Sequence, residues 1–214
     1  MKKIVVGFVS AAAALACVGA SAGSSVDLFV KGRIMPASCD INVNNNTVNL
    51  GDMLAGELSQ DSVNKLNDDG RADFAINCNA PTLVAIHPID NRAGSAFMGD
   101  LAYNDHEAFG MGLDSAGNKI GRFKMYMNIS TASGLASVSS FNGTTWKEGG
   151  FFSSAKETWH AAGKNKDGVW EVQPITSITG HFVFTNMYLA PMKNLSLGDE
   201  VKIDGHATME LVYL

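Results

Sequence analysis

The chain has 214 residues, of which 46% are hydrophobic, and a formal net charge of −5. This length and composition suit one folded domain preceded by a short leader. A mildly acidic chain without a basic stripe argues against nucleic-acid binding, so we expect no nucleic-acid partner.

The first 22 residues have the layout of a cleavable secretory signal. Two lysines open the chain, an apolar run spans 4–17, and small residues follow at 20–22. The run is too short for a comfortable membrane span, and no later run approaches about 20 apolar residues. We expect cleavage after Ala22 and export to the periplasm or the cell surface. Lipidation at Cys17 is the alternative, although Ala14 stands where a lipobox has Leu.

Removal of the signal leaves two cysteines, Cys39 and Cys78. Two thiols in an exported chain predict one disulfide. Closing a loop of this size would stabilise the fold by about 4 kcal/mol in the chain-entropy model. Two free buried thiols are the alternative.

Alternating apolar residues predict strands along most of the chain, and no segment sustains a helical period. Residues 114–118 read as a hairpin turn, and residues 79–81 read as a turn between two short strands. On the arm 120–129, Phe123, Met125 and Met127 share one face with Ile129. The expected strands are 26–34, 72–78, 82–88, 109–113, 120–129, 169–176 and 180–189.

Residues 130–168 are the least regular part of the chain, and we interpret them as hairpins and a long loop at one end of the fold. Three tryptophans lie here or just beyond, at Trp146, Trp159 and Trp170. They form a possible ligand-binding loop, since exposed aromatic side chains grip sugars or partners. Cross-strand packing is the alternative that we favour. Many short strands predict an all-β sandwich.

The last fourteen residues alternate most clearly. We expect one strand over 201–213 with one buried face. Its apolar side chains are Val201, Ile203, Ala207, Met209, Leu211 and Tyr213.

With these features the chain resembles subunits of chaperone–usher pili, the fimbrial proteins of Gram-negative bacteria. Such subunits have a signal peptide, a short N-terminal donor segment, two cysteines about forty residues apart and an alternating C-terminal strand with a penultimate aromatic. Here the cysteines lie 39 positions apart and Tyr213 is penultimate. Gly32 lies seven residues before Cys39, where these donor segments have a glycine. The middle of the chain resembles that of uncharacterised fimbrial-like periplasmic proteins. The similar regions are Asp90-Asn91-Arg92 and Phe109-Gly110-Met111-Gly112.

The resemblance implies an immunoglobulin-like, pilin-type sandwich that lacks its last strand, over residues 37–214. It implies that a periplasmic chaperone lends the missing strand, and that the donor segment of a neighbouring subunit later replaces it at an outer-membrane usher. Such β-strand addition would serve pilus assembly and cell adhesion. The donor segment would span 23–36, with Val26, Leu28, Val30, Gly32 and Ile34 facing the neighbour's groove.

One alternative stays open for the N-terminal segment and for the function. Residues 26–34 could be the first strand of a complete sandwich, an alternative that Phe29 favours because it is an awkward outward residue for a donor strand. The chain would then be a self-complete periplasmic or surface binding protein, adhesin-like and possibly glycan-binding, that does not polymerise.

The sequence offers little for catalysis, so we expect no enzyme, no cofactor and no metal site. The five histidines fall in different segments without a metal-ligand spacing. The tight polar cluster Asp105-His106-Glu107 reads as a solvated turn. The glycines at 110 and 112 precede a hairpin, not a helix, which does not fit a phosphate-binding loop.

Overall fold

The computed structural model describes residues 24–66, 70–99, 105–130, 134–154 and 156–214. The expected signal peptide at 1–22, with Cys17, lies outside these residues. The chain divides into two units, a short N-terminal segment that ends at Met35 and a body that begins at Pro36.

The N-terminal segment, residues 24–35, contains neither strand nor helix. Its apolar side chains are exposed; Leu28 and Val30, for example, are 89% and 104% accessible. The strand expected over 26–34 is therefore not formed in this structure.

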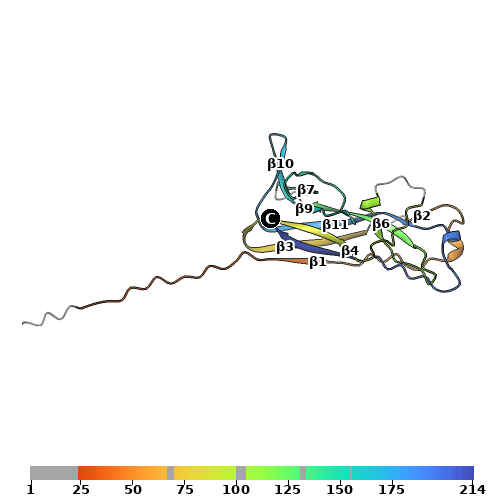
Figure 1. Cartoon of the computed structure of the whole chain (residues 1–214), viewed down its shortest axis with the longest axis horizontal. Helices are drawn as coiled ribbons and strands as arrows, with labels where there is room; N and C mark the ends of the chain where they lie inside the picture. Colours follow the sequence, from red (N-terminus) through yellow and green to blue (C-terminus); the bar gives the residue numbers. More distant parts are fainter. Residues whose placement is uncertain (1–23, 67–69, 100–104, 131–133, 155) are drawn as a thin grey trace, which may run out of the picture. The chain divides into compact units, whose positions relative to one another are not determined.

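The body is a β-sandwich of two antiparallel sheets, with no α-helix among the described residues (Figure 1). The first sheet has the order β1 (Cys39–Asn44), β3 (Gly70–Thr82), β11 (Ile175–Leu189), β6 (Gly121–Ile129) and β5 (Phe109–Gly110), with β2 (Asn64–Lys65) also paired to β11. The second has the order β12 (Ala207–Tyr213), β4 (Val84–Asp90), β9 (Trp159–Lys166), β7 (Ala136–Ser140) and β8 (Lys147–Glu148), with β10 (Val169–Val172) also paired to β9. Among the described residues, the 3-10 turns η1 (Ala55–Glu57), η2 (Asp105–Glu107) and η4 (Met192–Asn194) lie in the connections.

The core lies between the inward faces of the two sheets. Phe74 and Phe182 stack with ring centroids 4.7 Å apart, and Met125 and Phe152 are completely buried. The expected alternation of β6 is confirmed, because Phe123, Met125, Met127 and Ile129 all belong to this core. Burial of such side chains supplies the main favourable term in folding.

Two local predictions are confirmed. Cys39 and Cys78 form a disulfide that joins directly opposed positions of β1 and β3. The hairpin before β6 turns at Asp114, whose backbone N–H bonds the carbonyl of Asn118. The Asp114 carboxylate accepts a further bond from the Ser196 N–H, and this bond is the main reason that its pKa falls to about 2.

One expectation about secondary structure is right in part, and two are wrong. Residues 130–168 contain the expected hairpins, since β7 pairs with β8 and β9 with β10, but β9 also pairs with β4 and β7 inside the second sheet instead of lying in a long loop. No turn interrupts residues 79–81; β3 continues to Thr82, because a bulge opposite β11 absorbs Pro81. The C-terminal strand begins only at Ala207, so Val201 and Ile203 precede it.

Loss of the disulfide should lower the free energy of unfolding by about 3–4 kcal/mol, because the reduced unfolded chain regains the entropy of a loop of about forty residues. We expect this for the double change Cys39→Ser with Cys78→Ser, measured by urea titration against the oxidised chain. An unchanged midpoint would contradict a structural disulfide at this site.

Acid should weaken the fold through His160. Its ring lies between the sheets against Phe152, with centroids 4.3 Å apart, and its Nε2 has no hydrogen-bond partner among the described residues. Burial lowers the His160 pKa from 6.5 to about 3, because the interior disfavours the charged ring. The folded state therefore binds the proton less readily than the unfolded state. Stability is full above pH 6.5 and falls by about 1.4 kcal/mol per pH unit as the pH approaches 3.

His160→Leu should reduce the loss of unfolding free energy that accompanies a change from pH 7 to pH 4, as measured by urea titration. The matched control is His206→Gln, since His206 is exposed. Equal slopes in the parent chain and in the His160 variant would refute the assignment.

Candidate functional site

A large open groove of about 1400 Å³ lies along one side of the sandwich body, where β1 and β12 form the edges of the two sheets. Buried side chains form its floor, among them Met125, Phe182 and Met187. Half-buried side chains form its walls: Ile41, Val43, Val48, Leu50, Met53, Leu58, Val201, Ile203, Ala207 and Met209. The half-buried walls thus expose apolar surface along the groove.

The backbone of β12 faces the groove edge at alternate residues. His206 accepts a bond from the Asn91 N–H, and the Leu214 N–H bonds Leu83, so even-numbered residues point their backbone groups toward β4. In an antiparallel pair the intervening residues point theirs the opposite way. The N–H and C=O groups of Ala207, Met209 and Leu211 therefore point away from β4, along the free edge of the sheet.

The same argument holds for β1. The Asn79 N–H bonds the Ser38 carbonyl, so even-numbered residues of β1 face β3. The backbone groups of Cys39, Ile41 and Val43 point away from β3. Cys39 demonstrates the direction, because its N–H donates to the Tyr213 hydroxyl at 2.9 Å. The groove is therefore bordered by two strand edges with outward backbone donors and acceptors.

This Cys39–Tyr213 bond closes the groove at one end. The two edge strands meet where β1 begins and β12 ends, which we call the narrow end; the lining residues lie toward the other ends of both strands, which we call the wide end. At the wide end, the wall consists of the irregular segment 199–206 on one side and of residues 46–53 on the other. The disulfide at Cys39 holds β1 to β3 at the narrow end.

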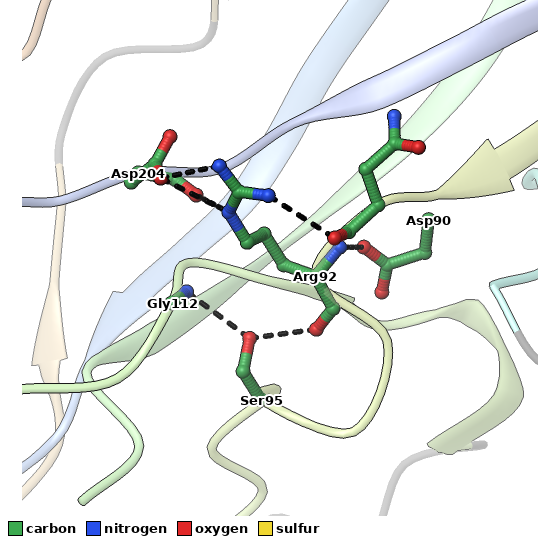
Figure 2. A network of polar contacts seen from close by, with 6 residues as sticks. Asp90, Arg92, Ser95, Gly112 and Asp204 are labelled. Carbon is green, nitrogen blue, oxygen red and sulfur yellow. Dashed lines mark hydrogen bonds and ion pairs between the residues drawn. The ribbon is translucent and has the colours of Figure 1, made fainter. Parts of the chain in front are cut away.

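A polar clamp holds the irregular wall in place (Figure 2). The Arg92 guanidinium donates hydrogen bonds to two groups of Asp204, the side-chain carboxylate and the backbone carbonyl oxygen. The carbonyl oxygen lies 3.1 Å from Nε of Arg92. The Arg92 backbone is held in turn, since its N–H donates to Asp90 at 2.8 Å and its carbonyl accepts from Ser95 at 2.7 Å. The clamp thus ties segment 199–206 to the loop after β4.

Two glycines allow the close approach that the clamp requires. A Cβ at Gly110 would lie 2.0 Å from the Ser95 hydroxyl oxygen, and one at Gly205 would lie 2.8 Å from the Phe123 ring. The Gly110 N–H also donates to Asp90 at 3.1 Å. Burial raises the pKa of Asp90, while this bond and the bond from Arg92 oppose the shift. Residues with larger side chains at these two positions would push the wall outward.

The residues expected for the C-terminal strand fall into two groups. Val201, Ile203, Ala207 and Met209 line the groove. Leu211 packs on the core beyond it, and Tyr213 is 51% exposed with its hydroxyl on Cys39. The structure thus adds walls that sequence reasoning missed, above all Val48, Leu50 and Met53; their spacing of two and three residues gave no clear strand or helix signal.

The three tryptophans come together, but not at the groove. Trp146, Trp159 and Trp170 pack around Ala85, Val138 and Ala161, which form a small cluster of their own in the second sheet. Trp146 and Trp170 form an isolated bridge. This packing agrees with the cross-strand alternative, and no tryptophan lines the groove.

The polar cluster at 105–107 is more structured than the expected solvated turn. It forms η2, and Glu107 pairs with the buried Lys124 at 2.6 Å. The His106 ring packs edge-on against Phe141. Within the described ranges, no group of three or more potential ligands is placed to hold a metal ion.

No protein-family model matches the chain, and neither the curated proteins nor the solved structures contain a match to it. In the described parts of the chain, no helix has the length and apolar character needed to cross a membrane.

Breaking the clamp should loosen the groove wall without unfolding the protein. Because the Arg92–Asp204 pair is partly exposed, Arg92→Met should cost only about 0–1 kcal/mol of global stability. Amide exchange over 199–206 should nevertheless rise clearly. Arg71→Met is the matched control, since it removes an exposed Arg–Asp pair, Arg71–Asp73, that does not line the groove. Equal exchange in both variants would mean that the clamp does not hold the wall.

Proposed function

We propose that this protein is a fimbrial subunit or fimbrial-like protein whose sandwich is completed by a strand from another chain. A periplasmic chaperone supplies that strand first. The N-terminal segment of a neighbouring subunit then replaces it at an outer-membrane usher, and the assembled fibre serves adhesion. On this proposal the chain is exported, and its body is an immunoglobulin-like fold without its last strand.

The observation that carries the proposal is the groove between β1 and β12. Its floor is apolar, and both of its borders present backbone donors and acceptors at Ile41, Val43, Ala207, Met209 and Leu211. A β-strand is the ligand that satisfies both features at once, because it offers a hydrogen-bonding ladder and side chains on alternate positions. Uncovered, such edges favour aggregation.

The N-terminal segment supplies a strand of the required pattern. Val26, Leu28, Val30 and Ile34 alternate with positions that are polar except for Phe29, and all four side chains are exposed. Burying four such side chains would contribute on the order of 6–12 kcal/mol before entropy losses. A segment that forms no strand of its own is free to become one in a neighbour.

Gly32→Leu tests the donor role. A Cβ at Gly32 meets nothing within 4 Å, so the variant should keep the melting temperature of the parent chain. It should fail to assemble or to enter fibres, because a large side chain then occupies a position at which the proposal requires a small one. Phe29→Leu is the control, since position 29 faces away from the groove in the same alternation; it should assemble normally.

The measurements are a melting curve and a fibre-incorporation assay. Normal assembly of the Gly32 variant would contradict the donor role. A lowered melting temperature, together with a soluble and stable monomeric parent chain that never associates, would favour the self-complete binding protein instead.

A further inference from the structure

The charged side chains exposed around the groove are mostly acidic. Asp52, Asp199 and Glu200 border its wide end. Among the described residues that line the groove, Lys202 and His206 are the basic ones, and Arg92 already holds Asp204. On the two edge strands, Asp40 of β1 and Glu210 of β12 are exposed as well. We call these five carboxylates the acidic frame: Asp40, Asp52, Asp199, Glu200 and Glu210.

The N-terminal segment carries the opposite charge on its outward face. If Leu28, Val30 and Gly32 face a groove, then Lys31 and Arg33 face away from its floor and toward the frame. The Lys31 ammonium lies 5.4 Å from the centre of the Phe29 ring, which places these two side chains on the same side of the segment. As a strand, the segment would thus present apolar side chains on the face toward the groove and its two basic side chains on the opposite face.

The charge of the whole chain divides in the same way. Residues 36–214 carry 12 basic and 20 acidic side chains, a formal charge of −8, whereas the described segment 24–35 carries two basic side chains and one acidic one. Exposed ion pairs contribute little individually. Several like charges around a cleft nevertheless steer an oppositely charged partner toward it and raise the association rate.

We propose that the acidic frame selects, among strands with suitable apolar side chains, a strand whose outward face is basic. The segment 24–35 of a second copy of this chain is such a strand, so the frame favours association of the chain with itself. This inference rests on the proposed function, and it adds that choice of partner depends on charge outside the groove.

The test uses the full chain, freshly refolded as a monomer, and a synthetic peptide of residues 24–36. Stopped-flow fluorescence would give the association rate at low and high salt. The peptide with Lys31→Glu and Arg33→Glu should associate about tenfold more slowly at low salt, and at nearly the same rate at high salt, because salt screens exposed charges. A peptide with Leu28→Ser and Val30→Ser should not bind at either salt concentration.

Reversing the frame should rescue the reversed peptide. Two frame variants serve, one per end of the groove: Asp199→Lys with Glu200→Lys, and Asp40→Lys with Glu210→Lys. At least one of them should restore the low-salt association rate of the reversed peptide to within about twofold of the parent rate. The variant that does so shows near which frame residues positions 31 and 33 lie, and hence the direction in which the strand runs. Glu148→Lys with Glu171→Lys is the control, since it changes the net charge equally at exposed residues of β8 and β10.

The outcomes separate the two proposals. If no peptide binds, the proposed function and this inference both fail. If the parent and reversed peptides bind at equal rates at low salt while the Ser peptide does not bind, the groove takes strands but the frame does not select them. If the control variant rescues as well as the frame variants, net charge acts and the frame does not.

Discussion

The structure depends on a constraint at one side of the sandwich, where two strand edges border an apolar floor. Water can hydrogen-bond the free backbone groups of Met209 and Val43, but it cannot favourably cover the half-buried apolar walls of the groove, such as Ile203. A strand placed between β1 and β12 satisfies both requirements, since its backbone pairs with the edges and its alternate side chains fill the groove. An extended chain is therefore the ligand that we propose for this groove.

The ends of the groove are held by different means. At the narrow end, the Cys39–Cys78 disulfide holds β1 to β3, and the hydrogen bond from the Cys39 N–H to the Tyr213 hydroxyl joins β1 to β12. At the wide end, the Arg92–Asp204 clamp holds a wall that has no regular structure of its own. Across the groove, both ends are thus held by polar contacts, while the disulfide fixes β1 within its own sheet.

Local patterns in the sequence predicted those features that depend on neighbouring residues. Strand alternation placed Phe123, Met125 and Met127 on one face, and the turn at 114–118 was clear from its Asp, Gly and Asn residues. The disulfide followed from the count of cysteines. An all-β sandwich of two sheets was likewise within reach of the sequence.

Features that depend on long-range contacts were missed. The clamp joins residues 112 positions apart, and only the fold brings Arg92 to Asp204. Alternation over 201–213 predicted one long strand, but Gly205 and the clamp end the pairing before Ala207. In β7 and β9, small residues such as Ala161 and Gly163 stand where a strand usually has larger apolar ones, because β10 and Trp170 cover them.

Residue-specific amide exchange of the body, with and without a peptide of residues 24–36, tests the account most directly. Filling of the groove by a strand predicts slower exchange, by roughly tenfold or more, at the residues whose backbone faces the groove: Ile41, Val43, Ala207, Met209 and Leu211. The intervening residues Thr208 and Glu210, which already face β4, should change little. Slowing at Thr208 and Glu210 alone, or no slowing at a peptide concentration that saturates the protein, would contradict strand addition at this groove.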